Sequence, residues 1–166
     1  GAHLALTDFT TTASIRSVLG VSELELRDTV LLNPVYLISL TEALYALHAD
    51  LVDDFDSAVA ASPRTTLQQR FVDLVQTFSA YAVANQCLGA VAMFAPITIK
   101  DARSELTRNS DPYVSLRTAI PSSLNIFKTL LLTAYAQINT DSPAPSALAR
   151  IRLVASPLGV NPVTGA

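Results

Sequence analysis

Glycine is nearly absent from the middle of this chain, and that absence most constrains its fold. Of the five glycines, only Gly89 lies between Val21 and Pro157. Single prolines punctuate the same region, at positions 34, 63, 96, 112 and 121. Long stretches without glycine, separated by single prolines, are typical of helices that end near each proline. The chain is therefore predicted to be all-α, a helical bundle of about four to five main helices.

Two short helices are predicted before the first proline. The first covers about 11–19, because a threonine among residues 10–12 can cap it and Gly20 can end it. Ser22 and Glu25 then have the spacing of a capping box, in which each side chain satisfies a free backbone donor of the other. This spacing predicts a second helix that ends at about residue 31.

Two long helices are predicted next, over about 34–61 and about 65–94. Asn33 and Pro34 supply a cap and a proline at the first helical position, which together favour a helix start. Each segment carries one apolar stripe with steps of three and four residues. The stripes are Leu37, Leu40, Leu44, Leu47, Leu51, Phe55 and Ala58 in the first, and Leu67, Phe71, Leu74, Phe78, Tyr81, Leu88 and Val91 in the second.

Shorter helical signals follow Pro96. Thr98 and Asp101 could start a helix that runs to about residue 108, and a last helix is predicted over about 121–139. Its apolar residues also alternate in steps of four and three, which predicts packing against a partner helix. They are Ile120, Leu124, Phe127, Leu131, Ala134 and Ile138.

Residues 140–166 differ in composition from the rest of the chain. Four of the nine prolines fall there, and "ARIRLVA" at 149–155 has the composition of one short strand. The segment also stays more apolar than a merely disordered tail. We therefore predict a helical domain over 1–139 and an extended C-terminal tail over 140–166 that docks on a partner. The predicted docking residues are Leu153, Val154, Leu158, Val160 and Val163.

The chain carries unusually little charge. At 166 residues it should form one domain with a core of its own, yet half of it is hydrophobic and only 15% is charged. This balance favours further burial, in an oligomer or against lipid. The net charge of −3 gives no general reason to bind nucleic acid. Residues 1–75 hold ten acids and four bases, whereas residues 76–166 hold four and seven, so the two halves could complement each other between subunits.

No arrangement of residues typical of catalysis or of a metal or cofactor site stands out, so we predict no enzyme activity and no cofactor. "DLVDDFD" at 50–56 is similar to the magnesium-binding helices of prenyl-type synthases, but no second acidic helix accompanies it, which favours a solvated helix face. His3 and His48 lack companions at metal-ligand spacing. Cys87 is the only cysteine, which excludes an intrachain disulfide and favours a buried, unreactive thiol.

Residues 74–99 contain no charged side chain, and 26 such positions are enough to span a bilayer. Two interpretations follow, a membrane span or a buried helix of the bundle. Gln76, Asn85 and Gln86 argue against lipid, and the run has no basic flank. Its many alanines suit close contact between helices, so the buried helix is preferred.

The segment "DFTTTASIRSVLGVSELELRDTVLLNPVYLISLTEAL" at 8–44 resembles the N-terminal region of head–tail connector proteins of tailed phages, also called adaptor or head-completion proteins. The similarity covers about a quarter of the chain. It rests on a threonine-rich cap followed by Ile15-Arg16, Leu19-Gly20-Val21, Glu25-Leu26, Asp28, Pro34 and Tyr36 ahead of a long helix.

The resemblance implies a structural subunit of the virion neck, made in the host cytoplasm. It implies a dodecameric homo-oligomeric ring that joins the portal protein to tail or neck proteins, with DNA only as passing cargo and no membrane. Two alternatives remain open at this point: a small holin-like membrane protein that spans with residues 74–99, and a helical protein-binding module.

Overall fold

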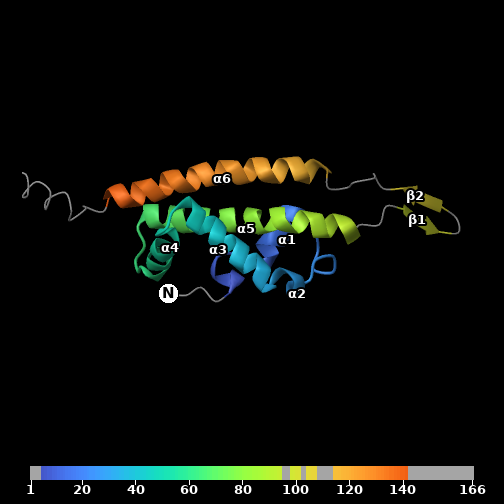
Figure 1. Cartoon of the computed structure of the whole chain (residues 1–166), viewed down its shortest axis with the longest axis horizontal. Helices are drawn as coiled ribbons and strands as arrows, with labels where there is room; N and C mark the ends of the chain where they lie inside the picture. Colours follow the sequence, from blue (N-terminus) through green and yellow to red (C-terminus); the bar gives the residue numbers. More distant parts are fainter. Residues whose placement is uncertain (1–4, 95–97, 102–103, 108–113, 142–166) are drawn as a thin grey trace, which may run out of the picture.

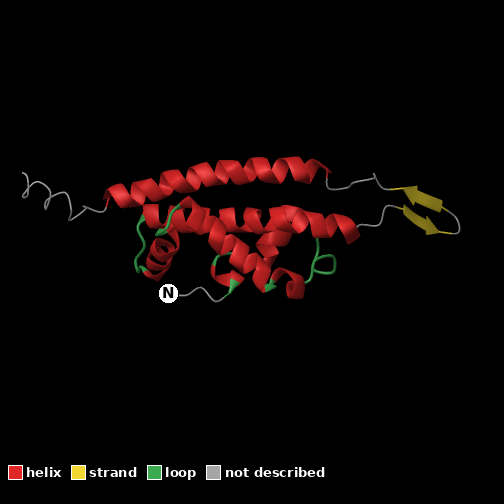
Figure 2. Ribbon diagram, in the orientation of Figure 1, coloured by secondary structure: helices red, strands yellow, loops and turns green. Residues whose placement is uncertain are grey.

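The computed structural model describes residues 5–94, 98–101, 104–107 and 114–141. Its elements along the chain are the 3-10 helix η1 (Leu6–Asp8), α1 (Thr12–Leu19), α2 (Asp28–Leu31), α3 (Pro34–Leu47), α4 (Leu51–Ala60), α5 (Thr66–Phe94), β1 (Thr98–Asp101), β2 (Ser104–Thr107) and α6 (Val114–Asp141). Helices dominate throughout (Figure 2), so the all-α prediction is confirmed.

Helix α5 is the centre of the fold (Figure 1). The chain leaves α5 through the antiparallel β1–β2 hairpin and returns as α6, which lies along one side of α5. Helices α1, α3 and α4 pack against other sides of α5. Among the described residues, α6 packs mainly against α5 and has few contacts with the N-terminal helices.

A line of aromatic rings joins the N-terminal segments to both long helices. Phe9 stacks on Phe55 of α4 with ring centroids 5.7 Å apart, and Phe55 meets the edge of Phe71 of α5 at 6.5 Å. Phe71 then lies 5.6 Å from Tyr135 of α6. The three phenylalanines are fully buried, so this line is part of one continuous core. The predicted stripe residues Leu40, Leu44, Leu51, Phe71, Phe78, Ile120 and Leu131 are buried in it as well.

Helix α1 forms as its capping residues predict. The Thr11 hydroxyl oxygen accepts from the amide N–H of Ser14 at 3.1 Å, and Gly20 ends the helix with a φ of 67° that side chains rarely adopt. The second predicted helix is wrong over 22–27. Glu25 accepts from the amide of Ser22 at 2.8 Å, as a capping box requires, but only α2, Asp28–Leu31, follows.

Arg16 of α1 holds this non-helical segment instead. Its Nε donates to the carbonyl of Leu26 at 2.7 Å, and its guanidinium pairs with Asp28. The hydrogen bond from Arg16 holds the pKa of Asp28 below its usual value. The segment is therefore fixed by a side chain from the preceding helix, an interaction that competes with helix formation.

The predicted single helix over 34–61 is also wrong. It breaks after Leu47, and α3 and α4 meet at an angle of 102°. His48 adopts extended backbone there, with φ −162° and ψ 138°. Because of the bend, α3 and α4 can each pack an apolar side against α5.

Three further predictions concern the chain after α4. The predicted helix over 98–108 is wrong, because residues 98–107 include the β1–β2 hairpin in which Ile99 pairs with Leu106. Helix α5 agrees with the prediction, but α6 starts at Val114, so Pro121 lies inside it and was not the start. The predicted strand and docking residues at 142–166 lie outside the described residues.

The membrane interpretation of residues 74–99 requires one helix that could cross a bilayer. Within the described ranges, no individual helix is long and apolar enough to cross a bilayer. Taken together, α3 and α4 are long and apolar enough for a broken membrane span. Length and composition are the only properties of this bent pair that favour such a span.

Candidate functional site

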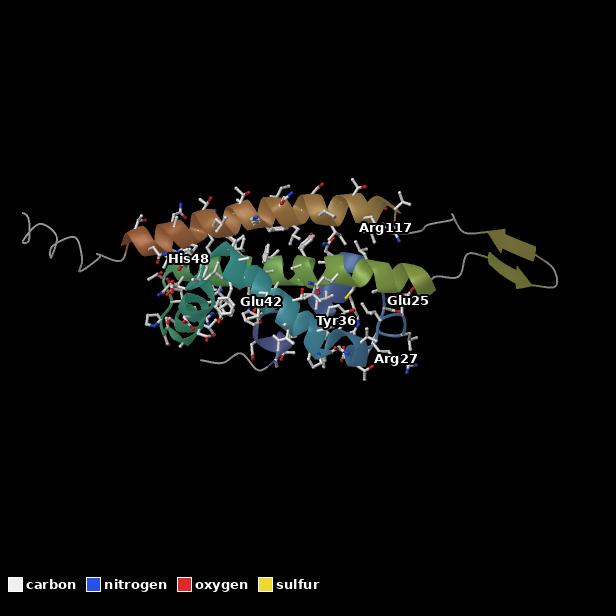
Figure 3. The ribbon with its side chains drawn as sticks, viewed as in Figure 1. Glu25, Arg27, Tyr36, Glu42, His48 and Arg117 are labelled. Atoms are coloured by element: carbon white, nitrogen blue, oxygen red, sulfur yellow. The ribbon has the colours of Figure 1, made fainter. Side chains whose placement is uncertain are left out.

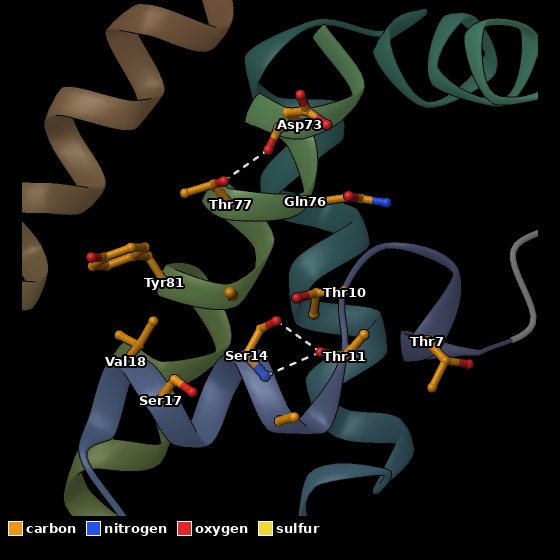
Figure 4. Close-up of a pocket in the computed structure, with 12 residues that line it drawn as sticks. Thr7, Thr10, Thr11, Ser14, Ser17, Val18, Asp73, Gln76, Thr77 and Tyr81 are labelled. Carbon is orange, nitrogen blue, oxygen red and sulfur yellow. Dashed lines mark hydrogen bonds between the residues drawn. The ribbon is translucent and has the colours of Figure 1, made fainter. Parts of the chain in front are cut away.

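A groove lined by hydroxyl groups lies between the η1–α1 segment and α5 (Figure 4). Its volume is about 530 Å³. Its polar lining comprises Thr7, Thr10, Thr11, Ser14, Ser17, Asp73, Gln76, Thr77 and Tyr81. The sequence placed Thr10 and Thr11 at a helix cap, but nothing in it indicated that α5 would lie opposite them.

Local hydrogen bonds occupy four of these groups, those of Thr11, Ser14, Asp73 and Thr77. The Thr11 hydroxyl caps α1 and lies 2.7 Å from the Ser14 hydroxyl. Thr77 donates to the carbonyl of Asp73 at 2.8 Å, and the Asp73 carboxylate accepts from Gln69 at 2.8 Å. No lining residue is a lysine, arginine, histidine or cysteine. The groove therefore offers hydroxyl and amide groups and one carboxylate, that of Asp73, and its lining pairs no nucleophile with a base.

A second polar cluster joins the α3–α4 bend to α6. The Tyr135 hydroxyl donates to Oδ2 of Asp54 at 2.6 Å and lies 3.2 Å from Nδ1 of His48. That nitrogen also accepts from the amide of Asp50 at 3.2 Å. Burial, with a smaller contribution from the bond to Asp54, raises the pKa of Tyr135 to about 12. The cluster holds its tyrosine neutral and fastens α6 across the bend.

The acidic run at 50–56 is thus divided. Asp50 precedes α4, Asp53 is exposed, and Asp54 turns toward Tyr135. The prediction of one solvated acidic face holds for Asp53 but is wrong for Asp54. Among the described residues, no group of three or more histidine, cysteine, aspartate or glutamate side chains is arranged to hold a metal ion.

Cys87 is fully buried in α5, as predicted. A hydrogen bond joins its thiol to the hydroxyl of Tyr36 on α3. Burial raises the pKa of the Cys87 thiol, and burial together with this bond raises the pKa of Tyr36 to about 12. A buried thiol with a raised pKa is a poor nucleophile, so the pair is a packing contact between α3 and α5.

The outer face of α6 is long, exposed and uncharged. It consists of Thr118, Ser122, Asn125, Thr129, Thr133, Ala136 and Thr140, all of which are exposed. Four hydroxyls on it donate to carbonyls of the same helix, for example Thr129 to Asn125 at 3.1 Å and Thr133 to Thr129 at 2.9 Å. A shallow groove of about 550 Å³ runs along its C-terminal half, between Thr129 and Thr140. These hydroxyls therefore need no acceptor from a partner that covers the face.

The outer face of α3 exposes large apolar side chains. Val35, Ile38 and Tyr45 are 58%, 62% and 44% exposed, and Glu42 lies among them. The sequence of α3 is apolar on both sides, yet the predicted stripe contains only Leu37, Leu40, Leu44 and Leu47 of this helix. The predicted docking residues of the tail lie outside the described residues.

Comparison with known proteins adds no relative. A scan against protein-family models, a search of curated proteins and a search of solved structures each found no match to this chain.

Proposed function

We propose that this chain is a structural subunit of a tailed-phage neck, a head–tail connector that forms a ring between the portal and the tail. The observation that carries the proposal is the exposed, uncharged outer face of α6. Helix α6 spans 28 residues, of which only Arg117, Lys128 and Asp141 are charged. Exposed helices of monomers normally carry more charge, so this face is suited to contact with another protein.

Two further observations support the same function. Residues 8–44, which carry the resemblance to connector proteins, include α1, α2 and most of α3, all of which belong to the packed body around α5. The Tyr135 cluster and the Cys87–Tyr36 pair both have structural explanations: the first joins helices, and the second packs α3 against α5. A protein that acts through assembly accounts for these features without a chemical step.

The ring is the testable part of the proposal. The purified chain is mixed with the portal protein encoded in the same genome, and the complex is imaged by electron microscopy with two-dimensional class averages. We expect an additional ring of twelve subunits below the portal, with the portal alone as the control. The function is wrong if the chain does not bind the portal, or binds it without forming a ring.

A further inference from the structure

We propose that neighbouring subunits meet head to tail, with the outer face of α6 of one copy docked on the outer face of α3 of the next. This inference rests on the proposed ring and names the two surfaces that would form it.

The α3 face has the spacing of a helix-packing seam. Val35, Ile38, Glu42 and Tyr45 follow one another in steps of three, four and three residues. This is the alternation by which one helix packs along another. Val35 and Ile38 are more than half exposed, which is costly for an apolar pair that stays in water. Glu42 is the one charged side chain in the row, so a matching partner must supply a cation beside an apolar surface.

The α6 face has the complementary properties. The groove along it is lined by Thr129, Leu132, Thr133, Ala136, Gln137 and Thr140, with no charge among them. Lys128 is exposed and lies one helical turn before Leu132, a residue that lines the groove. Neither Lys128 nor Glu42 has an ion-pair partner within the part of the chain that the structure describes. The uncharged outer face of α6 is therefore bordered by a cation, the exposed Lys128.

Pairing Glu42 with Lys128 sets the register of the contact. The next α3 residue in the row, Ile38 or Tyr45 depending on helix direction, lies about 4.5–6 Å further along the axis. The same step from Lys128 reaches Leu132, where the groove is apolar. One ion pair and one apolar side chain in the groove thus fit together in either helix direction, with Ile38 or Tyr45 beside Leu132.

Charge also selects between a head-to-tail and a two-fold arrangement. A two-fold contact centred on either residue would place Glu42 against Glu42 or Lys128 against Lys128, and both pairs repel. Helices α3 and α6 lie on different sides of α5, and Figure 3 labels Glu42 on the α3 side of the body. A subunit can therefore use both faces at once, and such heterologous contacts generate rings when the rotation closes.

The test uses two variants that each block one face, Ile38→Glu and Thr133→Glu. Both positions are exposed, so the fold should persist, which circular dichroism checks. We expect the wild-type chain to form assemblies larger than dimers in sedimentation velocity at high concentration, and each variant alone to remain monomeric. An equimolar mixture should give a 1:1 dimer and nothing larger, because one intact α3 face and one intact α6 face remain available to each other. Leu24→Glu, at an 88% exposed loop position, is the matched control and should assemble like the wild type.

A charge exchange tests the register. Glu42→Lys and Lys128→Glu should each weaken assembly by about tenfold in apparent Kd, and mixing the two variants should restore it. The inference is overturned by a monomeric wild type, by a blocked variant that still dimerises alone, or by a mixture that stays monomeric. Rings on the portal that form equally well from both blocked variants would also overturn it and leave the connector function standing. Head-to-tail assembly in solution without a ring on the portal would overturn the function and leave the contact standing.

Discussion

Replacing Tyr135 by phenylalanine isolates the bond that fastens α6 to the α3–α4 bend. The tyrosine is only 5% exposed, and its hydroxyl donates to Asp54 at 2.6 Å. Tyr135→Phe keeps the ring that packs 5.6 Å from Phe71 and removes only the hydroxyl. The substitution therefore measures the polar contact separately from the aromatic core.

The magnitude follows from the partners. A hydrogen bond to a charged group contributes about 1.5–3 kcal/mol to stability. Asp54 is half-buried and can bind water after the hydroxyl is lost, which moves the expected value toward the lower end. We expect Tyr135→Phe to lower the free energy of unfolding by about 1–2 kcal/mol. Asp54→Ala should add little in the Tyr135→Phe background, because the bond is already gone.

Urea unfolding at low protein concentration, followed by circular dichroism, measures all four members of this cycle. Tyr45→Phe is the matched control, since Tyr45 is 44% exposed and should change stability by less than about 0.5 kcal/mol. The reasoning fails if Tyr135→Phe is as stable as the control, or if the effects of Tyr135→Phe and Asp54→Ala simply add.

The same bond should vary with pH. The pKa of Tyr135 is raised from its ordinary value of 10.0 to about 12, so the folded state favours the neutral hydroxyl. Its contribution is complete below pH 10 and is lost as the pH rises through about 12. The stability difference between the wild type and Tyr135→Phe should therefore shrink over this window. A difference that stays constant from pH 9 to pH 12, within about 0.3 kcal/mol, would contradict this assignment.

Four further substitutions and one labelling test probe the packing. Leu44→Ala and Leu131→Ala should each lower the free energy of unfolding by about 2–5 kcal/mol, and Asp53→Ala by less than about 1 kcal/mol, measured by urea denaturation; equal midpoints would show that the helix faces are misassigned. Cys87 should react with a thiol reagent only in denaturant, and prompt labelling of the folded chain would contradict its burial. Arg16→Lys should lose the bond to the Leu26 carbonyl and about 1–2 kcal/mol, and an unchanged melting curve would argue against that contact.

The sequence predicted the buried sides of the helices better than their ends. Leu44 and Leu51 were assigned to one stripe and both are buried, although the chain bends by 102° between them. Leu47 and Leu51 are four residues apart, so the sequence spacing across the break is the same as the spacing within a helix. Periodicity alone does not distinguish this arrangement from one straight helix. The acids Asp53 and Asp54 in the first turn of α4 were the local sign of a new helix start.

The remaining errors come from rules that a distant contact can override. Pro121 was taken as a helix start because that is its usual place, yet Ile120 before it is buried in the core, and α6 extends back to Val114. The hairpin over Thr98–Thr107 depends on pairing between two four-residue strands, which a cap signal at Thr98 does not exclude.

The candidate surfaces were beyond the sequence for a related reason. The hydroxyl-lined groove needs Thr11 and Thr77 to meet, and the polar cluster needs Asp54 and Tyr135 to meet, across tens of residues. Local pattern carries no information on such pairs. The docking role of Leu153 and its neighbours stays a prediction.

Helix α5 lies between α6 and the N-terminal helices. Unfolding of α6 or of the N-terminal helices therefore exposes part of α5 to solvent. Fraying of α6 exposes the α5 side near Phe71, and loss of α1 exposes the opposite flank. Amide protons in the middle of α5 should therefore exchange with solvent only through global opening, while those at the ends of α6 exchange through local opening. The chain would then behave in hydrogen exchange as one cooperative unit whose slowest core is a single helix.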